Sequence, residues 1–240
     1  MSLRDVFRAN WRDMRAAREQ DAAYRRVWQT FRQYQRLVDG RHDTPEWRSH
    51  EGVFAACIVR VPAEALQPGL DELREALRPY AFIRLHPDRF LHIMLQELGF
   101  VCERPLARDE IGADRLHEFA TAAAATISAA PSFDVRLGGA NAFQDAVFLD
   151  VHDRGACARI HTRLRELATI RTTSRFAYLP HVTIAHFTTD APLGNLPAVI
   201  TRWRDWRFGT IVVNEIEIVT LRVDEPYPEL EPYAVIPLGG

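Results

Sequence analysis

The sequence predicts an α+β fold of two pseudo-symmetric lobes, with antiparallel-rich sheets lining a central cleft and an N-terminal helical extension. Apolar residues recur at steps of three and four over the first 40 residues, the period of an amphipathic helix. After residue 52, an apolar strand, a helix and a strand that carries a histidine follow one another twice. Two similar units of this kind indicate a duplicated α+β body rather than a doubly wound sheet.

The N-terminal extension is expected to span residues 1–50 and to be a helix over about the first 40. Gly40 is a typical C-terminal stop, and the polar residues 41–52 then link the helix to the rest of the chain. Its apolar stripe is rich in aromatic residues such as Trp11, Trp28 and Phe31. A stripe of this kind packs on its own domain or on a second copy. Self-association through residues 1–40 is therefore one hypothesis.

The first unit begins the domain expected over residues 51–240. Its elements are predicted from period-two and period-3.6 patterns. They are a strand at 53–61, a helix at 62–80, strands near 81–85 and 90–97, and an alanine-rich helix at 114–130.

The second unit repeats this plan and is followed by a β-rich tail. Strands are expected at 133–137, 146–151 and 180–187, a helix at 156–168, and tail strands at 210–223 and 233–238. The segment 194–206 is expected to be helical or irregular.

Composition indicates an unexported, cytoplasmic protein. Hydrophobic residues make up 47% and charged residues 26% of the chain, and no apolar run reaches the roughly 20 residues of a membrane span. The first residues have no apolar signal-peptide core. The three cysteines are scattered without a CxxC spacing, which argues against disulfides and thiolate metal sites.

The basic residues are unusual because all 30 are arginine. The absence of lysine excludes a Schiff base, a lysine nucleophile and a phosphate-loop lysine. No loop typical of nucleoside triphosphate binding is present either, so an ATP-driven ligase has no support.

Two histidines occupy equivalent places in the two units. Because side chains alternate along a strand, His92 shares a face with Met94, and His181 shares a face with Thr183. A histidine buried for structural reasons is the ordinary interpretation of either one alone. Their equivalent positions instead favour a pair brought together for acid–base chemistry near neutral pH.

The segments around these histidines resemble the 2H phosphoesterase superfamily, in its 2′-5′ RNA ligase-like branch. Members carry two His-x-Thr/Ser-x motifs, and Pro180-His181-Val182-Thr183-Ile184 fits the second closely. The first, around His92, keeps the apolar spacing and the trailing Leu98-Gly99. The resemblance runs from about residue 53 to the C-terminus and leaves the first 50 residues outside.

The resemblance implies a metal-independent phosphodiesterase that needs no cofactor. One of His92 and His181 would act as general base and the other as general acid, although the sequence does not decide which. Thr183 would bind a phosphate oxygen, and Gln96 is a candidate donor on the face of His92. Substrates would be 2′,3′-cyclic phosphates or 2′-5′-linked nucleotides and RNA ends.

The sequence departs from the family pattern at the first motif. Met94 stands in the place of its Thr or Ser, which removes a phosphate donor. Leu179 and His186 stand where arginines are common. These departures keep open an alternative, a catalytically weakened protein that binds RNA or nucleotide phosphates.

Two further sets of residues have competing interpretations. Phe143 and Tyr178 could line the cleft and stack on a base, or belong to the core. His86, His92, His181 and His186 could suggest a metal, but the opposite parity of His181 and His186 argues against one shared site, so no metal is expected.

Overall fold

The computed structural model describes residues 3–41, 47, 50, 52–168 and 177–239 of the chain. Its helices are α1 (Leu3–Phe31), α3 (Gly69–Leu77), α4 (Ala113–Ile127), α5 (Ala156–Leu167) and α6 (Leu196–Thr201), with 3₁₀ turns η1 (Ala63–Leu66) and η2 (Asp88–Phe90). The strands are β1 (Val53–Arg60), β2 (Ile83–Leu85), β3 (His92–Val101), β4 (Glu110–Ile111), β5 (Phe133–Ala142), β6 (Ala146–His152), β7 (His181–Phe187), β8 (Arg207–Val213), β9 (Glu215–Arg222) and β10 (Glu231–Pro237).

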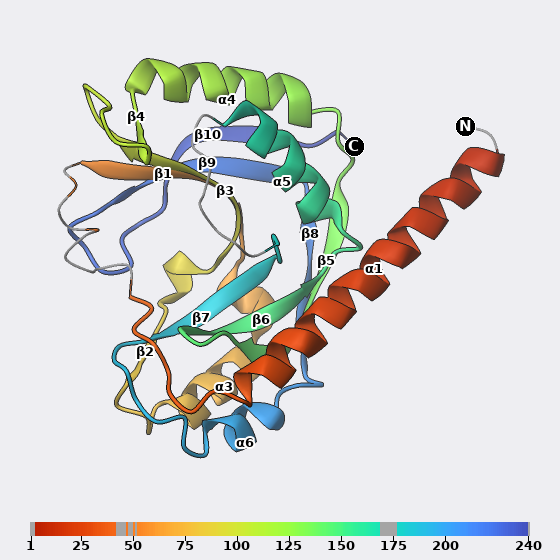
Figure 1. Cartoon of the computed structure of the whole chain (residues 1–240). Helices are drawn as coiled ribbons and strands as arrows, with labels where there is room; N and C mark the ends of the chain where they lie inside the picture. Colours follow the sequence, from red (N-terminus) through yellow and green to blue (C-terminus); the bar gives the residue numbers. More distant parts are fainter. Residues whose placement is uncertain (1–2, 42–46, 48–49, 51, 169–176, 240) are drawn as a thin grey trace.

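The strands form one curled sheet in the order β10-β9-β1-β3-β7-β6-β5-β8 (Figure 1). All neighbours along this path are antiparallel, while β2 pairs with β7 and the short β4 runs parallel to β3. The predicted α+β, antiparallel-rich fold with an N-terminal helix is thus confirmed. The sheets of the two units are one continuous sheet, joined where β3 meets β7.

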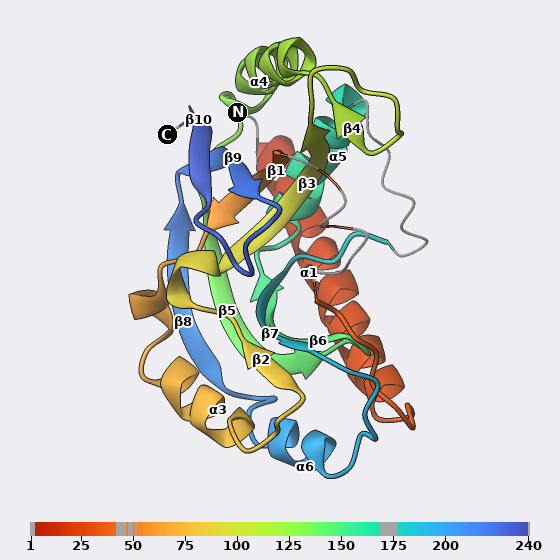
Figure 2. The ribbon, with the colours of Figure 1, turned by 90° about the vertical axis from the view of Figure 1, so that its left-hand side faces the viewer.

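Helices from one half of the chain pack on strands from the other half of the sheet. Helix α5, from the second unit, packs on β3 of the first, and α3, from the first unit, packs on β8, the tail strand that pairs with β5 of the second unit. Helices α4 and α5 therefore lie at one end of the molecule, and α3 and α6 lie at the other (Figures 1 and 2). This exchange makes the two units parts of one packed body.

Helix α1 runs across β5 and β6 (Figure 1). It ends at Phe31, nine residues before the expected stop at Gly40. Of the apolar residues that follow, Leu37 is buried without a helix: it is 1% exposed, and its N–H donates to the Ala191 carbonyl at 2.8 Å. Periodicity alone does not distinguish such a buried extended segment from a last helical turn.

Two other predicted elements are divided. The expected helix 62–80 consists of η1 and α3, separated by Gln67 and Pro68, whose missing N–H interrupts a helical ladder. The expected strand 210–223 is divided at Asn214 into β8 and β9, which pair with different strands: β8 with β5, and β9 with β1 and β10. Among the described residues, no helix is long and apolar enough to cross a membrane.

Gly209 tests the close approach of β8 to η1. A Cβ at this position would lie 1.7 Å from the Ala65 carbonyl oxygen, which is backbone and cannot move aside. We expect Gly209→Ala to lower the free energy of unfolding by about 1–3 kcal/mol, as overpacking does, measured by urea denaturation. Gly112→Ala is the control, because its Cβ would lie 3.7 Å from Pro105; we expect a change within about 0.5 kcal/mol. Equal effects of the two variants would contradict the packing.

Candidate active site

The two motif strands lie side by side in the centre of the sheet. Ile93 of β3 pairs with Val182 of β7, and both side chains are fully buried in the core. Because side chains alternate, the residues on either side of this pair emerge on the other face. These residues are His92, Met94, His181 and Thr183, and all four are partly exposed. We call this surface the histidine face.

The two histidines make the same backbone contact. The Nδ1 atom of His92 lies 2.7 Å from the Phe90 carbonyl oxygen, and that of His181 lies 2.8 Å from the Leu179 carbonyl oxygen. A carbonyl oxygen only accepts hydrogen bonds, so Nδ1 carries the proton in both rings. In the neutral state, each ring therefore carries its lone pair on Nε2.

The His181 ring packs against two aromatic side chains. It lies edge-on against Phe143 and Phe148 at centroid distances of 5.1 and 5.2 Å. This burial lowers the pKa of His181 below its usual 6.5, because it disfavours the cation; the Leu179 carbonyl and the Asp145 charge oppose the shift. The ring is thereby biased towards its neutral form near neutral pH.

A buried polar network lies beside His181. Asp150 of β6 is its direct partner in the strand register, and the Asp150 carboxylate receives a hydrogen bond from Asn141 at 2.9 Å and faces Arg204 at 3.1 Å. Burial raises the pKa of Asp150 to about 7, although the Arg204 charge opposes the shift. The second half of the sheet thus holds a titratable carboxyl group on the strand residue paired with its motif histidine.

Comparisons with known proteins identify the family of the chain. The family model described as the 2′-5′ RNA ligase superfamily matches residues 62–225, which include both motif strands. The chain belongs to the 2′-5′ RNA ligase superfamily. The resemblance to 2H phosphoesterases is thus confirmed at the level of the family. No curated protein sequence matches the chain.

Solved structures share the fold at low sequence identity. TT0787 of Thermus thermophilus is 21% identical with a TM-score of 0.57, covering 78% of this chain and 98% of that one. Escherichia coli LigT complexed with 3′-AMP is 16% identical with a TM-score of 0.56, covering 78% and 98%. ATU0111 of Agrobacterium tumefaciens is 12% identical with a TM-score of 0.54, covering 77% and 85%. At these identities the likeness establishes the fold alone.

The structure brings most of the predicted site residues of this superfamily member together. His92, His181, Thr183 and Met94 share the histidine face, and Phe143 borders it through its contact with His181. The catalytic and phosphate-binding roles of these residues stay predictions.

Two predicted site residues lie elsewhere. Register shifts between β1 and β3 pair Gln96 with the core residue Cys57, whereas Met94 pairs with Ile58. This bulge moves Gln96 off the face of His92; its amide is 3% exposed and donates to the Glu97 carbonyl oxygen.

The ring of Tyr178 also points away from the histidine face. It stacks on His161 of α5 at a centroid distance of 4.1 Å, and its hydroxyl donates to the Met94 carbonyl oxygen at 2.9 Å. Tyr178 therefore ties the segment that precedes β7 to the backbone of β3 and does not line the site.

A close pair of buried histidines was not predicted as a unit. His86 Nε2 and His186 Nδ1 are 2.9 Å apart, and Tyr227 packs against both rings. The contact depends on the pairing of β2 with β7, which places Arg84 opposite His186. Among the described residues, no group of three or more His, Cys, Asp or Glu side chains is arranged to hold a metal ion.

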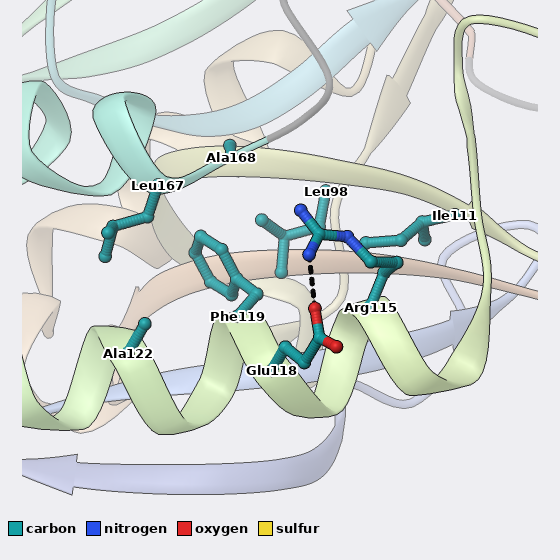
Figure 3. Close-up of a pocket in the computed structure, with 8 residues that line it drawn as sticks. All are labelled: Leu98, Ile111, Arg115, Glu118, Phe119, Ala122, Leu167 and Ala168. Carbon is teal, nitrogen blue, oxygen red and sulfur yellow. Dashed lines mark hydrogen bonds and ion pairs between the residues drawn. The ribbon is translucent and has the colours of Figure 1, made fainter.

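A pocket of about 140 Å³ lies away from the histidine face (Figure 3). It is bordered by α4, α5 and β3, and apolar side chains such as Phe119 and Leu98 make most of its wall. Its two charged residues, Arg115 and Glu118, form an ion pair with each other. This pocket is not part of the candidate active site.

The pKa of His181 tests its packing against Phe143 and Phe148. We expect a histidine that titrates below 6.5 in NMR spectra of the histidine-labelled protein, because burial disfavours its charged form. The His181→Ala variant identifies the signal by its loss. Since the neutral form persists below pH 6.5, any activity that needs neutral His181 should decline only below that pH. A pKa at or above 6.5 would contradict this environment.

Proposed function

We propose that the protein is a metal-independent phosphodiesterase that acts on 2′,3′-cyclic phosphates or 2′-5′-linked nucleotide and RNA phosphoesters in the cytoplasm. The observation that carries the proposal is the pair of motif histidines on one face. Each is held by the same Nδ1 contact, so each presents Nε2 for proton transfer. Membership of the 2′-5′ RNA ligase superfamily supports the reaction class.

In the proposed hydrolysis, His181 is the general base and His92 the general acid. The lowered pKa of His181 favours the neutral ring, which takes a proton from the attacking water. The water oxygen bonds to phosphorus, the ester P–O bond breaks, and protonated His92 gives its proton to the leaving oxygen. Thr183 donates to a non-bridging oxygen as negative charge develops.

The substrate class rests on the family and on the ligands of a structural neighbour. Escherichia coli LigT has been crystallised with 3′-AMP, with ATP and with NADP⁺. These ligands share a ribose phosphate, which is the group that a phosphodiesterase of this family would bind. We carry this chemistry to the histidine face as part of the proposal.

A second candidate is a binder of nucleotide phosphates with weakened catalysis. Met94 favours it, because the thioether occupies a place on the histidine face beside His181 where the family motif has a hydroxyl. Loss of one donor to a developing oxyanion costs about 10²–10³ in rate in other enzymes. The two candidates differ in turnover, not in ligand class.

Self-association and the domain division 1–50 and 51–240 also stay predictions. In α1, Tyr24 and Phe31 are buried against the body, whereas Trp11 and Met14 are 65% and 56% exposed. A second copy would therefore meet the N-terminal part of α1, not its C-terminal part.

The histidine variants test the reaction. We expect His92→Ala and His181→Ala each to lower kcat by about 10²–10⁴-fold on the best member of a panel of 2′,3′-cyclic nucleotides and 2′-5′ dinucleotides, because each removes one proton transfer. EDTA should leave the wild-type rate unchanged. The measurement is product formation followed by chromatography.

His117→Ala is the matched control for these variants. His117 is exposed on α4, far along the sequence from both motifs, so its loss should leave kcat within about twofold. Wild-type turnover in His92→Ala or His181→Ala would refute the proposal. Binding without turnover in the wild type would favour the second candidate.

Met94→Thr tests the missing donor. We expect kcat to rise about tenfold, because a hydroxyl beside His181 can stabilise charge on a phosphate oxygen. Met94→Val is the control, since valine has the shape of threonine without its hydroxyl. If both variants change kcat equally, the effect is one of packing and the donor argument fails.

A further inference from the structure

The hydroxyl of Tyr24 in α1 occupies a position in the sheet beside the second motif. Pairing between β6 and β7 ends at Asp150 and His181. Tyr24 Oη lies at the next position: it accepts from the Val151 N–H at 3.0 Å and lies 2.5 Å from the Pro180 carbonyl oxygen. The hydroxyl has a single proton to donate, and the Val151 carbonyl oxygen at 2.8 Å is the alternative acceptor. The tyrosine therefore bridges the two strands where a ladder bond would otherwise continue.

The local sequence suits such a bridge. Pro180 has no N–H, so it cannot complete a reciprocal pair with β6. The Tyr24 side chain is 1% exposed, so water has no access to its three backbone partners. Burial raises the pKa of Tyr24 well above its usual value, so the hydroxyl keeps the proton that it donates to a carbonyl oxygen.

A second contact of α1 reaches the other neighbour of His181. The Asn141 amide donates to the Tyr24 carbonyl oxygen at 3.2 Å and to Asp150 at 2.9 Å. Asp150 stands opposite His181 in the register. Arg204, which faces Asp150, also lies over the ring of Trp28 in α1 at 5.5 Å. Helix α1 thus contacts the backbone before His181 directly, and it contacts Asn141 and Arg204, the two partners of the Asp150 carboxyl group.

We propose that α1 is a structural part of the active site and that Tyr24 is a positioning residue for His181. The inference rests on the proposed function, in which His181 transfers a proton. Neither Tyr24 nor any other residue of α1 lies within the family match over residues 62–225. The motif histidine lies inside the matched region, but the contacts that support it come from the N-terminal extension outside that region.

The physical link is short. The Leu179 carbonyl oxygen fixes the His181 ring, and the next carbonyl along the chain, that of Pro180, is fixed by Tyr24. Removal of the hydroxyl deprives the Val151 N–H and the Pro180 carbonyl of their hydrogen bonds to Tyr24 in a buried site. The start of β7 must then shift to satisfy these groups. A shift of about 1 Å at a catalytic group can cost about 10²-fold in rate.

Tyr24→Phe is the test, since it removes the hydroxyl and keeps the ring. We expect kcat to fall about tenfold with KM within about twofold, because the proton transfer is misplaced while the other binding groups remain. In ¹⁵N spectra of the histidine-labelled protein, the Nδ1 and Nε2 signals of His181 should move towards mixed tautomers. Those of His92 should stay unchanged.

Gln20→Leu is the matched control on the same helix. The Gln20 amide is buried and donates to Asp153 at 2.9 Å, so its loss weakens the docking of α1 without touching the start of β7. We expect Gln20→Leu to lower Tm about as much as Tyr24→Phe does, while the His181 signals and kcat stay unchanged. In the wild type, a nuclear Overhauser effect should connect the Tyr24 hydroxyl proton with the Val151 amide proton.

The outcomes separate this inference from the proposed function. Unchanged His181 signals in Tyr24→Phe, equal losses in Tyr24→Phe and Gln20→Leu, or an absent Overhauser effect would each overturn the positioning role. None of these results would change the outcome of the His181→Ala test, so the proposed reaction would still stand. Conversely, full turnover in His181→Ala would refute the proposed reaction, while the NMR signals would still decide whether Tyr24 orients the ring.

Discussion

The pair formed by Ile93 and Val182 determines the geometry of the whole candidate site. It joins the two halves of the sheet at the strands that carry the motifs, and both side chains are fully buried. Since side chains alternate, a slip of one residue would turn His92 and His181 into the core and expose the apolar pair. Burial of two aliphatic side chains, worth about 1.5–3 kcal/mol each, thus fixes where both imidazoles emerge.

The polar groups around His181 depend on the same burial. Removal from water lowers the pKa of His181 and raises that of Asp150, because it disfavours the charged form of each. Such groups are costly to bury unless they have partners, and here Asn141, Arg204 and α1 provide them. The N-terminal helix therefore contributes more than apolar area, since its backbone and Tyr24 satisfy groups that the sheet leaves unpaired.

The features that the sequence predicts are those encoded by local periodicity. Alternation along two short segments places His92 with Met94 and His181 with Thr183, and the structure agrees. Gln96 shows the limit: the bulge that turns it into the core arises from the register with β1, which no local pattern of β3 contains. The contact of His86 with His186 likewise needs the pairing of β2 with β7. Long-range register decides both cases, and the sequence does not state it.

The two halves of the site are alike in backbone and unlike in chemistry. On the β3 side, Met94 pairs with Ile58 and packs with the apolar cluster around Phe90, and Arg60, the register partner of His92, is paired with Glu217. On the β7 side, Thr183 lies on the same face as His181. Asp150 is the partner of His181 in the neighbouring strand, and Tyr24 of α1 contacts the backbone just before it. Oxyanion stabilisation needs fixed donors in a site with little water. Under the proposed function, the phosphate would therefore lie against β7, with His181 beside it and His92 facing the leaving oxygen.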